Sequence, residues 1–222
     1  SEAVSGVTPA SFTLTGTTAM SAMAPVNAST YQVTASGGDL ASLNGVVGLN
    51  LSAAAAISDS AGNVLAIAEP ATDETFTLDN TAPTTSVSAP SVTATASADV
   101  TYTVTYADAD SVTLTPSDIV LNKTGTADAT VAVTGSGAAT RTVTLSGITG
   151  DGTLGITVPA GTAADAVSNP AEAGGTSATF SVDNTLPTVA VTAPVNSPDA
   201  FPITITFSEV VTGFVDTEIT AT

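Results

Sequence analysis

The sequence predicts an all-β chain built from β-sandwiches, and three observations lead to this prediction. The 222 residues are 43% hydrophobic but only 4% aromatic, a balance that suits many thin strands of small side chains rather than Leu-rich helices. Apolar and polar residues alternate with a period of two along most of the chain, as in strands with one buried face. A nine-residue phrase, FTLDNTAPT at 76–84, returns as FSVDNTLPT at 180–188, which indicates repeated units.

The alternating runs predict the individual strands, separated by turns that contain Gly, Asn, Asp and Pro. In the first part of the chain the predicted strands are 11–16, 30–35, 47–53 and 74–79. After the first copy of the phrase they are 85–90, 100–107, 111–116, 129–135, 140–147, 154–161 and 178–183. These are seven short strands in about 100 residues, the number of an immunoglobulin-like sandwich. The chain has no Cys and no Trp, so the prediction covers only this architecture.

Further matches extend the repeat beyond the phrase. The second copy repeats the residues that follow the first copy: Pro83, Val87, Ala89 and Pro90 return as Pro187, Val191, Ala193 and Pro194. FSEVVTG at 207–213 also matches SEAVSG at 1–6. We therefore predict tandem seven-stranded sandwiches joined by short Pro-containing linkers. The predicted parts are 1–82, a domain that lacks its first two strands; 83–186, a complete domain; and 187–222, the first strands of a third.

These motifs resemble a known family. FSEVVTG, the Gly-Asn loop DSAGN at 59–63 and the closing FTLDNTAPT are similar to the bacterial immunoglobulin-like repeats of giant surface adhesins and biofilm-associated proteins. The resemblance covers the whole chain. It implies a long extracellular stalk, often stiffened by calcium at domain junctions, that holds a terminal binding module away from the cell. The loop DAVSN at 165–169 departs from the pattern, because Ser168 stands where the first copy has Gly62.

Charge limits the classes of partner and of activity. Two basic and twenty acidic residues give a net charge of -18, so the chain repels nucleic-acid phosphates and anionic lipid. No apolar run approaches the roughly 18 residues of a membrane helix, and we expect no membrane insertion. Without His or Cys, Ser-His-Asp and Cys-His sites and His-ligated zinc sites cannot form within the chain. We therefore expect no enzyme. The first ten residues show no secretion signal, and we interpret the chain as a piece of a longer exported protein.

Strand order predicts where acidic side chains meet. Successive strands of a sandwich reverse direction, so the complete domain should place YADAD at 106–110 and DAVSN at 165–169 at the end that faces the preceding domain. The preceding domain should bring GGDL at 37–40 and its closing LDN at 78–80 to the same place. Six to eight carboxylate and carbonyl oxygens are the preferred ligands of Ca²⁺. The candidate calcium ligands at this first junction are Asp79, Asp108, Asp110, Asp165 and Asp39.

The same logic applies to the next junction, where the candidate ligands are Asp151, Asp183 and Glu209. An alternative for each Asp is a local role, because Asp side chains in turns accept hydrogen bonds from nearby backbone N–H groups. The spacing does not match an EF-hand loop. The single lysine, Lys123, lies in a segment interpreted as a polar loop, and an isopeptide bond from it to an Asn or Asp is a further alternative.

Two functions of different classes fit these features. The first is a structural stalk segment of a secreted or cell-surface adhesin or matrix protein, with neighbouring repeats as its partners. The second is a binding module whose loops recognise a glycan or a protein. Recognition surfaces gather Trp, Tyr and Arg, and the chain has no Trp and one Arg, which favours the stalk. The two strands missing from 1–82 leave an open edge, which predicts strand exchange or filament and layer assembly with other copies.

Overall fold

The structure is a computed structural model that describes residues 2–52, 55–66, 75–196 and 200–219. It is nearly all β, with 47% strand and 4% helix in several sheets consistent with a β-sandwich, which confirms the predicted class. Its helical residues lie in short 3-10 turns, η1 (Pro9–Ser11), η2 (Pro116–Asp118) and η3 (Asp216–Glu218). The chain divides into two compact units. Unit 1 comprises Ser1–Thr84, Tyr106–Val112 and Ala160–Glu172, and unit 2 comprises Thr85–Thr105, Thr113–Pro159 and Ala173–Thr222.

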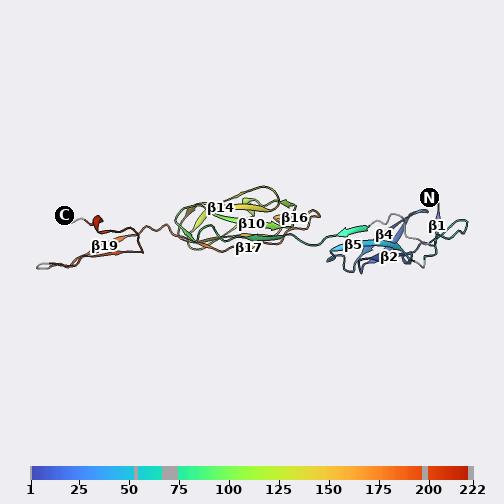
Figure 1. Cartoon of the computed structure of the whole chain (residues 1–222), viewed down its shortest axis with the longest axis horizontal. Coiled ribbons are helices and arrows are strands. Elements are labelled where there is room, and N and C mark those ends of the chain that lie inside the picture. Colours follow the sequence, from blue (N-terminus) through green and yellow to red (C-terminus); the bar gives the residue numbers. More distant parts are fainter. Residues whose placement is uncertain (1, 53–54, 67–74, 197–199, 220–222) are drawn as a thin grey trace. The chain divides into compact units, whose positions relative to one another are not determined.

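Unit 1 contains small antiparallel sheets (Figure 1). One has three strands in the order β2 (Phe12–Thr15), β5 (Gly45–Leu51) and β7 (Thr75–Leu78). A second consists of the hairpin β3 (Met20–Asn27) and β4 (Thr30–Ser36). Two short pairs join β1 (Val4–Ser5) to β6 (Ser58–Asp59) and β11 (Ser111–Val112) to β16 (Ala163–Ala164). Among the described residues of this unit, the buried apolar side chains are Val47, Ala55, Ile57, Pro83, Tyr106, Ala163 and Ala171.

Unit 2 contains two larger sheets and a hairpin. The four-stranded sheet has the order β13 (Asp128–Thr134), β14 (Thr140–Thr149), β10 (Val100–Ala107) and β8 (Thr84–Val87). The five-stranded sheet has the order β12 (Val120–Lys123), β15 (Gly152–Val158), β18 (Phe180–Val182) and β9 (Ala94–Thr95), and β17 (Gly175–Thr176) also pairs with β15. The hairpin joins β19 (Val189–Thr192) to β20 (Thr204–Phe207).

The main hydrophobic core belongs to unit 2. Alternate residues of β10 are buried, as a period-2 strand requires. The strand β15 is buried at three consecutive residues, 154–156. The hydroxyl of Tyr102 in β10 donates to the carbonyl of Ala178 at 3.2 Å, just before β18, and so ties the four-stranded sheet to the five-stranded one. The fully buried apolar side chains of this unit include Val100, Tyr102, Val104, Val143, Leu145, Leu154, Ile156, Val158 and Phe180.

The strand predictions hold for most of the larger strands and fail in identifiable places. The run 100–107 coincides with β10. The run 111–116 stops at Val112 because Thr115 and Asp118 cap η2: the Thr115 hydroxyl donates to the Asp118 carboxylate at 2.7 Å. The alternating pattern does not predict β3, which contains Pro25, or β12, which ends in polar residues.

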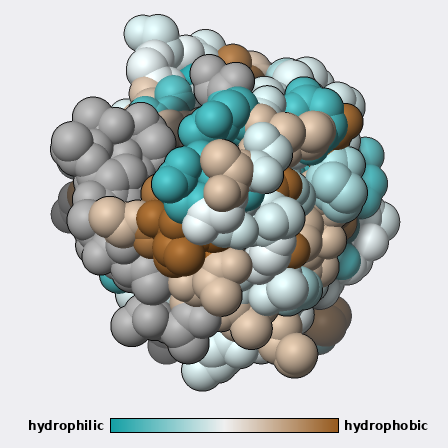
Figure 2. Space-filling model, turned by 90° about the vertical axis from the view of Figure 1, so that its right-hand side faces the viewer, coloured by the Kyte–Doolittle hydropathy of each residue, from teal (hydrophilic) through white to brown (hydrophobic). Residues whose placement is uncertain are grey.

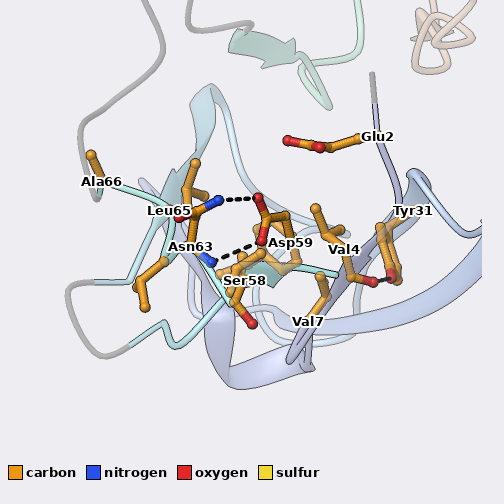
Figure 3. Close-up of a pocket in the computed structure, with 12 residues that line it drawn as sticks. Glu2, Val4, Val7, Tyr31, Ser58, Asp59, Asn63, Leu65 and Ala66 are labelled. Atoms are coloured by element: carbon orange, nitrogen blue, oxygen red, sulfur yellow. Dashed lines mark hydrogen bonds between the residues drawn. The ribbon is translucent and has the colours of Figure 1, made fainter. Parts of the chain in front are cut away.

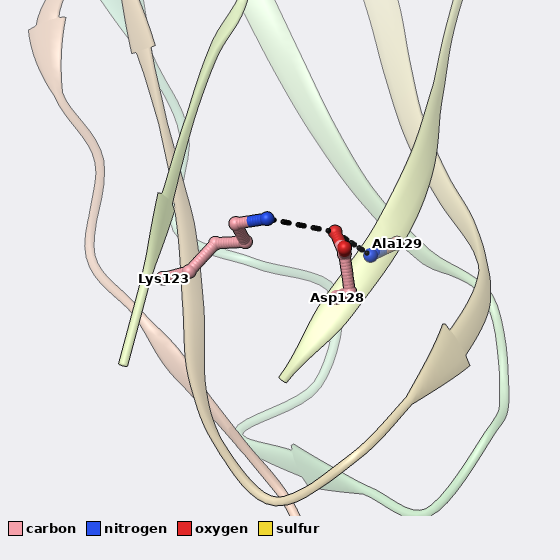
Figure 4. A network of polar contacts seen from close by, with 3 residues as sticks. All are labelled: Lys123, Asp128 and Ala129. Carbon is pink, nitrogen blue, oxygen red and sulfur yellow. Dashed lines mark hydrogen bonds and ion pairs between the residues drawn. The ribbon is translucent and has the colours of Figure 1, made fainter. Parts of the chain in front are cut away.

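The interpretation of Lys123 as part of a polar loop is wrong. Lys123 is the last residue of β12, and its ammonium lies 3.2 Å from the Asp128 carboxylate at the start of β13 (Figure 4). Both side chains are about half exposed, so the pair is a surface ion pair that contributes little to stability. The Ala129 N–H and this lysine hold the pKa of Asp128 below its ordinary value.

Candidate functional site: the Asp-Asn-Thr junctions

Each copy of the repeated phrase places an Asp directly after the last strand of a sheet. Asp79 follows β7, and its Oδ1 accepts a hydrogen bond from the N–H of Thr81 at 2.9 Å. Asp183 follows β18, and its Oδ1 accepts one from the N–H of Thr185 at 3.1 Å. Both are Asx turns, in which a side-chain carboxylate takes the place of a backbone acceptor. The Asp of the phrase therefore closes a turn where each linker begins.

The Asn of the phrase fastens the linker to a second connection. The amide of Asn80 donates to the carbonyls of Leu43 at 2.7 Å and Leu40 at 3.1 Å, and its N–H donates to Asn44 Oδ1 at 2.6 Å. This connection leads into β5, the neighbour of β7. The first linker thus begins with its backbone held against the connection that leads into β5.

The second copy repeats this arrangement. The amide of Asn184 donates to the carbonyl of Gly150 at 2.7 Å, and its N–H donates to Asp151 Oδ1 at 2.6 Å. Asp151 precedes β15, the neighbour of β18. The hydroxyl of Thr185 adds a bond to Asp151 Oδ2 at 3.0 Å. The acidic pattern of the sequence does not point to Asn80 or Asn184, although each copy of the phrase contains one of them.

The first linker has additional partners from residues 160–172. The carbonyl of Asp79 accepts a hydrogen bond from the side-chain amide of Asn169 at 2.9 Å. The carbonyl of Pro83 accepts one from the N–H of Glu172 at 3.0 Å, and the Pro83 ring is buried. The second linker differs, since Leu186 is 81% exposed. The first linker is therefore anchored at both of its ends.

The loops 59–63 and 165–169 have the same hydrogen bonds despite the change at Ser168. Asp59 Oδ1 accepts from the N–H groups of Ala61 at 2.9 Å and Asn63 at 2.8 Å, and Asp59 Oδ2 accepts from the Asn63 amide at 2.7 Å. In the second loop, Asp165 accepts the equivalent three bonds at 3.0, 2.8 and 2.8 Å.

The backbone of these loops also matches. Gly62 has φ 88° and Ser168 has φ 73°, so Ser168 adopts the left-handed conformation for which Gly is better suited. The difference between the loops lies in the second acceptor of Asn169, the Asp79 carbonyl. Within the described residues, Asn63 has no corresponding bond to a linker.

Hydrogen bonding lowers the pKa of several of these carboxyl groups. The Thr17 hydroxyl and the Thr18 N–H lower the pKa of Asp39. The N–H of Asn184 and the hydroxyl of Thr185 lower the pKa of Asp151. Partial burial opposes ionisation of Asp165, but the bonds from Asn169 and Val167 outweigh it and keep the pKa below its ordinary value. Neutral donors therefore satisfy the hydrogen bonding of these carboxylates. This is the local role that was the alternative to metal binding.

The predicted ligands of the first junction come together in part. Asn169 bridges the Asp165 carboxylate and the Asp79 carbonyl. The N–H of Asp110 donates to the Ala164 carbonyl at 2.9 Å, next to Asp165. Asp39 precedes Leu40, whose carbonyl accepts a bond from Asn80. Asp108 is exposed, with φ 63°.

At the second junction, Thr185 links Asp151 to Asp183. Glu209 is exposed, and its neighbour Ser208 exchanges hydrogen bonds with Thr188 at 2.9 Å. In the part of the chain that the structure describes, no three acidic side chains gather as a metal site would need.

Unit 1 also contains a cavity of about 420 Å³. Its lining includes Val4, Tyr31, Ile57 and Leu65 (Figure 3). The Tyr31 hydroxyl donates to the Val4 carbonyl at 3.2 Å. Because the Asp59 carboxylate beside it is occupied by Asn63, the cavity presents mainly apolar side chains.

The junctions offer hydrogen bonds that hold the start of each linker in place. None of the helices in the described residues has the length and hydrophobicity needed to cross a membrane. Comparisons with protein-family models, curated proteins and solved structures found no match to this chain.

Proposed function

We propose that this chain is a structural stalk segment, in which tandem immunoglobulin-like domains act as spacers within a secreted or cell-surface adhesin or matrix protein. The observation that carries the proposal is the repeated junction. In both copies Asp closes a turn and Asn fastens the linker to the connection that leads into the neighbouring strand. A spacer needs linkers that resist bending, and these bonds together with a Pro of fixed φ supply that resistance.

Matching strand registers support the tandem repeat. Val47 pairs with Phe76 in β5–β7, and Leu154 pairs with Phe180 in β15–β18. The 3-10 turns η1 and η2 begin with the same Thr-Pro pair and the same capping arrangement. Together with the two equivalent Asp-Asn loops, these features favour two copies of one domain type.

The side chains that a recognition surface would use are engaged elsewhere, which disfavours the binding-module alternative. Tyr102 and Tyr106 are buried, and Tyr31 is half-buried in the cavity wall. The guanidinium of Arg141 donates to the carbonyls of Gly137 and Thr140 in its own hairpin at 2.8 Å. Exposed Tyr and Arg side chains are typical anchors of protein recognition.

Calcium at the junctions is a second part of the proposal. The density of acidic residues at the first junction supports it, because Asp108 and Asp110 form no side-chain hydrogen bond within the described residues and Asp79 uses only Oδ1. The absence of a preformed ligand group among the described residues means that any such site would have to assemble on binding.

The stalk proposal is tested on the junction amides. Asn169→Ala and Asn184→Ala remove linker bonds, whereas the matched control Asn63→Ala removes only a bond within its own loop. We expect faster amide hydrogen exchange at Thr81 in Asn169→Ala and at Thr185 in Asn184→Ala. Small-angle scattering at low concentration should show greater flexibility in both. If all three variants match the wild type, the junctions do not stiffen the chain.

A further inference from the structure

Asn44 occupies the same place at the first junction as Asp151 occupies at the second. Each directly precedes the glycine that begins β5 or β15. In each sheet that glycine pairs with the last residue of β7 or of β18. The Oδ1 atoms of Asn44 and Asp151 accept the N–H groups of Asn80 and Asn184, both at 2.6 Å. The two copies therefore differ here by an amide in place of a carboxylate.

This difference removes one hydrogen bond from the first junction. Asp151 Oδ2 accepts the hydroxyl of Thr185 at 3.0 Å. Thr81 is the counterpart of Thr185, and its N–H closes the same Asx turn, but within the described residues its hydroxyl has no bond to Asn44. The amide nitrogen of Asn44 is a donor, whereas the second oxygen of a carboxylate is an acceptor. A carboxylate at position 44 would give the Thr81 hydroxyl the acceptor that Thr185 has.

Asn44 is the one Asn of the sequence that is followed by Gly. The backbone nitrogen that follows an Asn can attack the side-chain Cγ, and Gly hinders this approach least because it has no Cβ. A Cβ added at Gly45 would meet only the Leu43 side chain, at 4.0 Å, whereas a Cβ added at Gly152 would clash with the Thr124 carbonyl. The surroundings of Gly45 therefore leave room for the attack.

The hydrogen bonding of Asn44 also favours this reaction. The Asn80 N–H lies where negative charge develops on Oδ1 during attack at Cγ, and a fixed donor at a developing oxyanion lowers the barrier. Within the described residues no hydrogen bond holds Asn44 Nδ2, the leaving nitrogen. Asn44 is exposed, and so is Asp151 in the other copy, so water reaches this position in both.

Exposure alone does not distinguish Asn44. Figure 2, which looks onto the part of the chain that holds β1, shows hydrophilic side chains at the surface, and Asn63 is exposed as well. The Asn63 amide nitrogen, however, donates to Asp59 Oδ2 at 2.7 Å, and the next residue is the β-branched Val64. Asn63 is therefore an internal comparison for Asn44.

We propose that Asn44 is a site of spontaneous deamidation and that its aspartate product gives the first junction the hydrogen bonding of the second. The Gly45 nitrogen loses its proton to solvent and bonds to Asn44 Cγ, while the Cγ–Nδ2 bond breaks and the nitrogen leaves as ammonia with a proton from solvent. Water then opens the cyclic imide at either carbonyl. The net reaction converts asparagine and water into ammonia and either aspartate or isoaspartate, and the aspartate product keeps the acceptor for the Asn80 N–H.

The first experiment follows the loss of ammonia in the full 222-residue chain at mildly alkaline pH by mass spectrometry of its peptides. Asn44 should deamidate at least about tenfold faster than Asn63, and Gly45→Ala should slow the reaction at Asn44 about tenfold because it adds a Cβ. This variant should fold, since Gly45 has room for a Cβ and no left-handed φ. Fragmentation of the product should show aspartate as well as isoaspartate.

The second experiment uses Asn44→Asp in place of the deamidated chain. Thr81→Val removes the hydroxyl and keeps the N–H that closes the turn. It should lower the melting temperature of the Asn44→Asp variant by a few degrees, and that of the wild type by much less. The matched control is Thr185→Val, which should lower the melting temperature of the wild type, because Asp151 already accepts that hydroxyl.

Three outcomes would overturn the proposal: equal rates of ammonia loss at Asn44 and Asn63, isoaspartate as the sole product, or a Thr81→Val effect that is the same with and without Asn44→Asp. None of them bears on the stalk proposal, which is tested through the flexibility of Asn169→Ala and Asn184→Ala.

Discussion

At the residue scale, Ser168 shows how a sequence departure can leave a structure unchanged. Its φ of 73° lies in the left-handed region where Gly62 has φ 88°, and a non-Gly residue there costs about 1–2 kcal/mol. Glycine also raises the conformational entropy of the unfolded chain, which offsets part of this strain relief. Ser168→Gly should therefore stabilise its unit by only about 0.5 kcal/mol. Gly62→Ala should destabilise by about 1 kcal/mol. Urea denaturation checks both signs, and stabilisation by Gly62→Ala would contradict the assignment.

Acid sensitivity also belongs to individual residues. Hydrogen bonds lower the pKa of Asp59 and Asp165 in the folded state. The two carboxylates therefore stabilise the fold above about pH 4, the pKa of Asp in the unfolded chain. This stabilisation is lost as the pH falls through the pKa of the folded state. We expect the melting temperature to drop between pH 5 and pH 2.5, and to drop less in the Asp59→Asn, Asp165→Asn double variant. Equal acid slopes would contradict these hydrogen bonds.

At the element scale, alternation and turn residues made most of the larger strands predictable. β10 followed directly from VTYTVTYA. The strands β3 and β12 could not be found in this way, since Pro25 lies inside one, and Asn122 and Lys123 lie in the other. Their strand state depends on pairing with β4 and β15, which a local pattern does not contain.

The two equivalent phenylalanines provide a test at the same scale. Phe180→Ala removes a fully buried ring and should cost about 3–5 kcal/mol. Phe76→Ala removes a mostly exposed one and should cost about 0.5 kcal/mol or less in dilute protein. Calorimetry of the two variants measures the difference, and equal losses would show that Phe76 is buried in solution.

At the scale of the whole molecule, the sequence predicted that acidic loops and linkers meet, but not how their charges are satisfied. Asp39, Asp151 and Asp165 accept hydrogen bonds from N–H and O–H donors. Two of these donors belong to Thr17 and Asn184, which are uncharged, so the charge pattern of the sequence does not identify them. The position of Asp79 near Asn169 agrees with the strand-order argument. The metal prediction required several carboxylates at one point, a matter of side-chain geometry that strand order does not determine.

Calcium remains testable on the intact chain. If a junction binds Ca²⁺, a concentration about one hundred times the dissociation constant should add about 2.7 kcal/mol per site. The melting temperature would then fall on chelation. Asp79→Asn keeps the Oδ1 acceptor for Thr81 but removes the charge, so it should reduce the calcium response while preserving the turn. A wild-type melting temperature that chelation leaves unchanged would exclude the calcium joint.

The bonds of Asn80 also determine how the chain would respond to mechanical load. Tension that arrives through the linker is divided between the end of β7 and the connection that leads into β5, because Asn80 holds both together. Strand β7 cannot then be peeled away one residue at a time until these bonds break. Since Asn184 holds the end of β18 to the connection that leads into β15 in the same way, we expect β18 to resist peeling under load as β7 does.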